Sequence, residues 1–69
     1  MVSRDGQSKE SKNRLKQFAV VYLAKTTESG ATVEAVFHAM NEAGLFGWER
    51  TIAQESVERG KVDKLLHLQ

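Results

Sequence analysis

Residues 32–44 read TVEAVFHAMNEAG, and this stretch decides the fold. Thr32 is a favourable helix N-cap, because its hydroxyl can accept a hydrogen bond from a free backbone N–H of the first turn. Glu34 places a negative charge in that turn, where it complements the helix dipole. Gly44 fits the position after the helix, since glycine adopts left-handed backbone angles without penalty. The apolar side chains at helical spacing form the expected buried stripe, which consists of Val33, Val36, Phe37 and Met40.

The residues that follow Gly44 predict two more helices. Gly47 opens a helix over about residues 48–59, and Gly60 ends it. The apolar face expected for this helix consists of Trp48, Ile52, Ala53, Ser56 and Val57. A short fourth helix is predicted from the apolar residues of the tail, which are Val62, Leu65, Leu66 and Leu68.

The residues that precede Thr32 predict one helix behind a polar arm. Residues 1–7 are polar and contain Gly6, so we expect a flexible basic arm. Ser8 or Ser11 can cap the first helix, which is expected to end near Lys25. Its apolar stripe is Leu15, Phe18, Ala19 and Tyr22, widened by Val20, Val21 and Leu23.

These patterns together predict a small all-α bundle of three to four short helices, with one domain over residues 8–69. The chain has 69 residues, no proline and no cysteine, and no alternating strand pattern is sustained. A domain this small buries only about 60% of its unfolded surface, so its stability is expected to be marginal. The many apolar positions around the first helix therefore predict a homodimer with that helix in the interface.

Charge is unevenly distributed along the chain. Residues 1–25 carry six basic and two acidic side chains, a net charge of +4, whereas residues 26–60 carry six acidic and two basic ones, a net charge of −4. A basic segment beside an acidic body can attract phosphate, or it can be neutralised within the fold or a dimer. Both interpretations remain open from the sequence.

The basic segment supplies the first candidate site, a surface for nucleic acid. Lys9, Lys12 and Lys16 recur at positions that share one helical face, where they could contact backbone phosphates. The alternative is a solvated lysine face that only keeps the protein soluble. The complete set of expected phosphate contacts is Arg4, Lys9, Lys12, Arg14 and Lys16.

The two helices around Gly44 have the outline of a helix-turn-helix. In that motif, early residues of the second helix reach base edges, so Arg50 and Gln54 become secondary candidates for base contact. Glu49 would occupy the same region and would repel phosphate. We favour the simpler interpretation that two packed helices are joined by a turn.

The turn itself supplies the second candidate site. Phe46 and Trp48 flank Gly47, and exposed aromatic side chains of this kind are frequent hot spots for protein partners. Burial of Trp48 against a small core is the alternative, and we favour it for the only tryptophan in the chain. Either Leu45 or Phe46 is expected to fold back on the preceding helix.

Other classes of function are disfavoured. There is no phosphate-binding glycine loop and little room for a water-excluding pocket, so no enzyme, cofactor or small-molecule substrate is expected. Glu34, His38 and Glu42 line one helical face, but they spread over about 12 Å, too far to hold one metal ion. No apolar run is long enough to span a membrane, and a cytoplasmic location is expected by default.

The sequence therefore predicts a small regulatory or accessory protein, for instance in transcription regulation, that contacts nucleic acid through its basic arm and first helix. DNA is the expected nucleic acid. The alternative is a protein-interaction module or adaptor that uses the apolar first helix and the Phe46/Trp48 turn.

Overall fold

A computed structural model describes the backbone of residues 2–68 and the side chains of residues 9–68. Three α-helices and one short 3-10 helix follow one another along the chain, and no strand occurs between residues 2 and 68. The elements are α1 (Val2–Ser29), α2 (Val33–Ala43), α3 (Trp48–Glu58) and η1 (Val62–His67). The all-α fold predicted from the sequence is confirmed.

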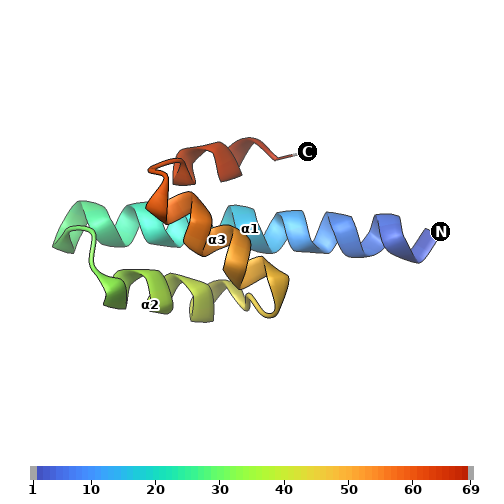
Figure 1. The fold of residues 1–69 in the computed structure, drawn as a ribbon, viewed down its shortest axis with the longest axis horizontal. Coiled ribbons are helices and arrows are strands. Elements are labelled where there is room, and N and C mark those ends of the chain that lie inside the picture. The colour runs from blue at the N-terminus through green and yellow to red at the C-terminus, as the bar shows by residue number, and fades with distance from the viewer. Residues whose placement is uncertain (1, 69) are drawn as a thin grey trace.

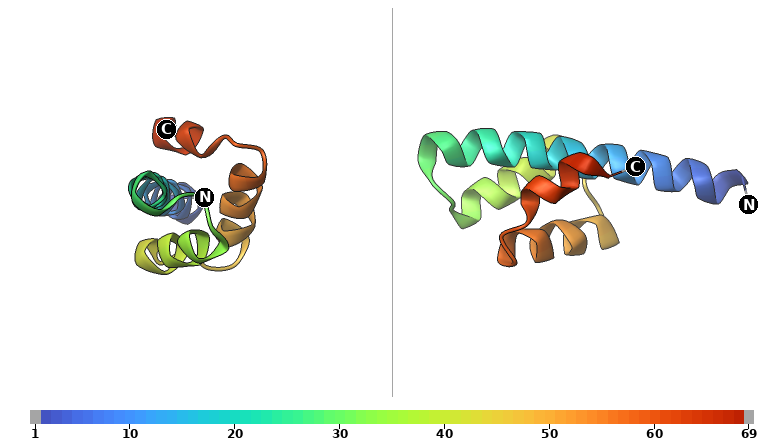
Figure 2. Two further views of the ribbon diagram at one scale, coloured as in Figure 1. Left: turned by 90° about the vertical axis from the view of Figure 1, so that its left-hand side faces the viewer. Right: turned by 90° about the horizontal axis from the view of Figure 1, so that it is seen from above.

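Helix α1 is the axis of the structure (Figure 1). Seen along this helix, α2, α3 and η1 surround it on three sides, with α2 and η1 on opposite flanks (Figure 2). The N-terminal part of α1 continues beyond the other three elements, which gives the molecule its elongated outline of 41 × 20 × 17 Å. The middle and C-terminal parts of α1 therefore form the side of the core that all other elements share.

Small side chains let the helices approach closely. Ala19 of α1, Ala39 of α2 and Ala53 of α3 are completely buried, and Phe18 is the large apolar side chain with no exposed surface. The rings of Phe18 and Tyr22 stack with their centroids 5.6 Å apart. The stripe predicted on the first helix is thus confirmed. The buried apolar core as a whole consists of Leu15, Phe18, Ala19, Tyr22, Ala35, Val36, Ala39, Met40, Ala43, Leu45, Ala53, Val62 and Leu65.

The ends of α2 agree with the sequence prediction. The Thr32 hydroxyl accepts a hydrogen bond from the backbone N–H of Ala35 at 3.1 Å. Gly44 has a left-handed φ of 71°. The Gly44 N–H donates to the Asn41 carbonyl and the Leu45 N–H to the Met40 carbonyl, which is the bonding pattern of a Schellman motif. Leu45 is buried as the residue that folds back, and it fixes the direction in which the chain leaves α2.

Helix α3 ends in the same way, which confirms the predicted stop at Gly60. The Gly60 N–H donates to the Val57 carbonyl and the Lys61 N–H to the Ser56 carbonyl at 2.8 Å. This turn sends the chain back toward α1, where η1 buries Val62 and Leu65. The predicted fourth helix therefore exists as a 3-10 helix.

The predicted ends of the first helix are wrong. α1 begins at Val2 instead of Ser8 or Ser11, so residues 2–7, expected to form an arm, belong to the helix, while Met1 lies outside the described residues. Ser11 is buried within the helix and caps nothing. At the other end, the hydroxyls of Thr26 and Thr27 donate to the Leu23 carbonyl at 3.2 and 2.8 Å. These bonds satisfy the hydroxyl groups inside the helix, which continues past Lys25 to Ser29.

The buried face of α2 is also different from the prediction. Val36 and Met40 are buried as expected, but Val33 and Phe37 are 70% and 51% exposed. Three alanines occupy the rest of the buried face, namely Ala35, Ala39 and Ala43. The helix is rotated because alanines permit a closer approach to α1 than Val33 and Phe37 would allow. Phe37 is consequently a surface residue.

The element η1 covers the side of α1 that motivated the prediction of a dimer. Val62 and Leu65 pack into the common core, and Val21 and Leu23 of α1 are partly buried against it. Val20 is the large apolar side chain of α1 that stays exposed among residues 9–29. Covering α1 therefore does not require a second copy of the chain, and the homodimer stays a prediction.

The contrast between two phenylalanines gives a test of this core. We expect Phe18→Ala to lower the free energy of unfolding by about 3–5 kcal/mol, because a fully buried ring is removed. Phe37→Ala should cost about 1 kcal/mol, since half of the side chain is already in water. Urea unfolding followed by circular dichroism measures both values.

A loss as large as that expected for Phe18→Ala can unfold a domain of this size completely. Phe18→Leu is therefore the milder companion variant, and it should still be less stable than Phe37→Leu. Equal losses at the two positions would contradict the placement of α2 described here.

Candidate interaction site at the α2–α3 turn

An ion pair between Arg14 of α1 and Glu49 of α3 lies behind the α2–α3 turn. The Arg14 Nε lies 2.9 and 3.0 Å from the two carboxylate oxygens of Glu49, and Nη2 lies 2.5 Å from Oε2. Glu49 is only 1% exposed at its side chain, whereas Arg14 is 27% exposed. Two parallel N–H donors on one carboxylate form the bidentate geometry that makes such pairs strong and directional. The pair therefore fixes the start of α3 against α1.

Neighbouring polar groups complete the surroundings of this carboxylate. The backbone N–H of Phe46 donates to Oε1 of Glu49 at 3.3 Å. The Ser11 hydroxyl accepts from Arg14 Nη2 at 3.4 Å, from one turn earlier in α1. Within residues 9–68, no buried side-chain nitrogen or oxygen lacks a hydrogen-bond partner. A buried charge is tolerated when its hydrogen bonds are satisfied in this way.

The protonation of Glu49 reflects these contacts. The hydrogen bond from Arg14 lowers the pKa of the Glu49 carboxyl below its ordinary value, although burial acts in the opposite direction. The nearby Ser11 hydroxyl and the Phe46 backbone N–H lower the pKa of Glu49 further. The same pair raises the pKa of Arg14, which stays protonated at every accessible pH. Both partners are therefore charged at neutral pH.

The aromatic residues of the turn lie on the solvent side of the ion pair. The guanidinium carbon of Arg14 is 5.0 Å from the centroid of the Phe46 ring, within the range of a cation–π contact. Phe46 is 64% exposed and Trp48 is 60% exposed. The preferred expectation that Trp48 is buried is therefore wrong. Gly47 between them has a φ of 61° and a ψ of −133°, a conformation that a residue with a side chain adopts only with strain.

The structure places the candidates for phosphate contact in different surroundings. Lys9 is exposed on α1, and Lys12 and Lys16 are partly buried next to it on the same helix. Arg14 is directed at Glu49, and 27% of its side chain stays exposed. Arg4 belongs to α1, but its side chain lies outside the described residues. Among residues 9–68, the Arg14–Glu49 pair is the only ion pair, so the three lysines have no ionic partner there.

The candidates for base contact are used within the protein. Arg50 donates through Nη1 to the Leu45 carbonyl at 3.2 Å, which supports the end of the α2 turn. Gln54 donates to Glu58 of the same helix at 3.2 Å. Glu49, which a helix-turn-helix would direct at DNA, points into the protein. These contacts agree with the simpler interpretation of two helices joined by a turn.

The sequence interpretation missed the structural role of Glu49. The only available signal was its position four residues before Ala53, which places both side chains on one face of α3. Trp48 and Ile52 are large and apolar, so they predict a buried face that begins at Trp48. The buried face of α3 begins one residue later, at Glu49. Its partner Arg14 lies 35 residues away, and no sequence periodicity connects the two.

Comparisons of this chain with protein-family models, with curated proteins and with solved structures find no match. None of the helices between residues 2 and 68 is both long enough and apolar enough to cross a membrane. In the described part of the chain, no three His, Asp or Glu side chains come together as metal ligands, and Glu34, His38 and Glu42 are all exposed. The candidate site therefore rests on its own geometry.

The lowered pKa of Glu49 predicts the direction of a pH effect on stability. The unfolded chain binds a proton at Glu49 more readily than the folded chain, so folding is stabilised above the ordinary carboxyl pKa of about 4.3. That stabilisation should be lost as the pH falls through the folded value. Between pH 7 and pH 3, the thermal midpoint of the wild type should fall more steeply than that of Glu49→Gln, which should start several degrees lower.

The matched control is Glu55→Gln, which removes an exposed carboxylate from the same helix. Its thermal midpoint should follow the wild-type curve throughout. If the thermal midpoints of Glu49→Gln and the wild type fell in parallel between pH 7 and pH 3, the ion pair would not contribute to the loss of stability in acid.

Proposed function

We propose that this protein is a small, non-enzymatic protein-interaction module whose contact site is the Phe46/Trp48 turn. The observation that carries the proposal is the exposure of both aromatic side chains on a turn that the Arg14–Glu49 pair holds in place. Large exposed aromatics are costly to leave in water and supply a disproportionate share of interface energies. A cytoplasmic location stays a prediction.

The rigidity of the turn is a second feature, besides the exposure of its aromatics, that supports a role in binding. The start of α3 is held by the ion pair, the preceding residues by the Schellman motif, and Phe46 by its contact with Arg14. An ordered surface loses less conformational entropy when it binds than a flexible one, and this loss is among the main costs of association. The turn therefore presents its aromatics in a preorganised arrangement.

The partner in this proposal is another protein or a second copy of the chain. A homodimer built on the turn would differ from the dimer expected from the sequence, which placed α1 in the interface. A twofold contact through Phe46 and Trp48 would bury the same patch on both protomers. The two possibilities are separated by the size of the purified protein in solution.

Replacing both aromatics tests the contact site. Affinity capture followed by mass spectrometry identifies proteins retained by the wild type, and sedimentation equilibrium at tens of micromolar measures self-association. Each hot-spot aromatic contributes on the order of 2 kcal/mol, so Phe46→Ala or Trp48→Ala should weaken the contact roughly 30-fold. The double variant should abolish it while its helical signal stays intact.

The matched control is Val20→Ala, which shortens an exposed apolar side chain on α1, outside the turn. This variant should bind as the wild type does. A double aromatic variant that retains every captured protein and the same molecular mass would contradict the proposed function.

A nucleic-acid-binding protein is the second candidate. Lys9, Lys12 and Lys16 follow one another on α1 without an ionic partner among residues 9–68, and this observation supports a phosphate-contacting face. Two observations weigh against it as the first choice. Arg14 is held by Glu49, and Arg50 and Gln54 make contacts within the protein.

Duplex DNA of mixed sequence tests this second candidate. Binding should weaken steeply with salt, and the triple variant Lys9→Gln, Lys12→Gln, Lys16→Gln should reduce the slope of log K against log salt by about 3, one phosphate per lysine. The thermal midpoint should change little, because Lys and Gln have similar helix propensities and none of the three lysines forms an ion pair within residues 9–68. Absence of DNA binding by the wild type at low salt would reject this candidate.

A further inference from the structure

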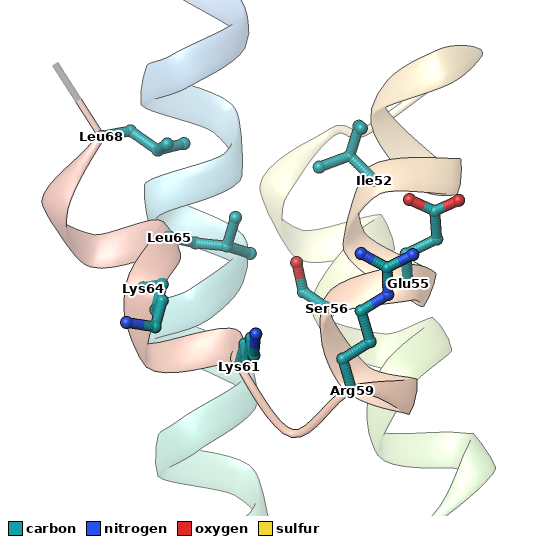
Figure 3. A pocket seen from close by; sticks show the side chains of 8 residues that line it. All are labelled: Ile52, Glu55, Ser56, Arg59, Lys61, Lys64, Leu65 and Leu68. Carbon is teal, nitrogen blue, oxygen red and sulfur yellow. The ribbon is translucent and has the colours of Figure 1, made fainter.

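A groove lies between the C-terminal half of α3 and η1 (Figure 3). Ile52 and Ser56 of α3 face Leu65 of η1 across it, and Leu68 extends the apolar floor at the end of η1. The floor is therefore formed by aliphatic side chains from two elements. The Schellman turn at Gly60 holds these two elements at a defined separation.

The rim of the groove is mostly positively charged. Arg59 and Lys61 stand where α3 leads into η1, and Lys64 lies on the outer edge of η1 (Figure 3). Glu55 is the one carboxylate among the eight lining residues, so the lining has a net charge of +2. None of the four forms an ion pair within residues 9–68. The rim therefore lies where the acidic segment of residues 26–60 ends, because Arg59 is close to its end and Lys61 and Lys64 follow it.

The dimensions of the groove favour side chains over a complete small molecule. Its volume is about 270 Å³, below the range of about 300–1,000 Å³ that is typical of drug-sized ligand sites, and it is partly open to solvent. Free phosphate or nucleic acid would use the cations but would leave the aliphatic floor exposed. A ligand that uses both parts needs apolar and acidic groups side by side.

We propose that the groove between α3 and η1 binds an acidic amphipathic helix of a partner protein. The apolar side chains of that helix would lie on Ile52, Leu65 and Leu68, and its carboxylates would reach the cations of the rim. Recognition of an amphipathic helix in an apolar groove is a recurrent mode of binding, and charge complementarity selects among such helices. The proposal does not depend on the Phe46/Trp48 turn, which lies at the opposite end of α3.

A synthetic peptide provides the probe. The peptide places leucines at i, i+3, i+4 and i+7 and glutamate or alanine elsewhere, and its control carries lysine in place of every glutamate. On titration of the ¹⁵N-labelled full chain, the glutamate peptide should shift backbone amides of residues 52–68. The lysine peptide should bind at least about tenfold more weakly.

Two sets of variants separate the rim from the floor. Lys61→Gln with Lys64→Gln should weaken binding roughly 3- to 10-fold, as expected for two exposed charge pairs. Lys9→Gln with Lys12→Gln changes the net charge equally on α1 and should leave the affinity within about twofold. Ser56→Leu should fill the groove and weaken binding more than about tenfold, while amide resonances outside residues 52–68 keep their positions.

The remaining outcomes decide against the proposal. Equal binding of both peptides, equal losses in the two lysine pairs, or no binding of the glutamate peptide at millimolar concentration would overturn it. Changes in the chemical shifts of the groove amides when only the protein concentration is raised would assign the groove to a second copy of the chain. This result would also overturn the proposal. Phe46→Ala with Trp48→Ala should leave peptide binding unchanged, so this proposal and the proposed function can fail separately.

Discussion

The bidentate pair between Arg14 and Glu49 is the interaction on which the rest of the structure depends. It joins the middle of the first helix to the start of the third, and it lies directly beneath the turn that carries the exposed aromatics. A buried carboxylate is a poor source of net stability, because the loss of its hydration offsets most of the attraction. Its contribution is to direction, since the bidentate geometry requires a defined placement of the start of α3 against α1. The same pair directs the guanidinium of Arg14, one of the predicted phosphate contacts, at Glu49.

Much of the fold could be predicted from local patterns, as the second helix illustrates. The N-cap at Thr32 and the left-handed glycine at position 44 depend on neighbouring residues alone, and both were identified correctly. The buried face of the same helix depends on what packs against it. The largest side chains predict the wrong face, because alanines face α1 instead. The predicted start of α1 is wrong for a related reason. A polar segment that contains a glycine is typical of a flexible arm, but here the helix continues through it.

The candidate site was predictable in part. Phe46 and Trp48 were recognised as possible contact residues from their type and position, but their exposure depends on Glu49 taking the inward place on α3. That placement requires a partner 35 residues away, which no local pattern indicates. The groove at η1 was not recognised at all, because its floor and its rim come from two elements whose separation is set by the turn at Gly60. Long-range pairing and turn geometry were thus the missing information.

The packing of η1 against α1 has a consequence for how the chain folds. The last element along the sequence covers one flank of the first, so the apolar side chains of that flank stay uncovered until residues 62–67 have left the ribosome. Helix α2 can cover its own flank much earlier, because it follows α1 after a short connection. A pair of α1 and α2 that forms before η1 has been made would leave this apolar side open to solvent. The packing of η1 then closes it, so the last element completes the cover of the first.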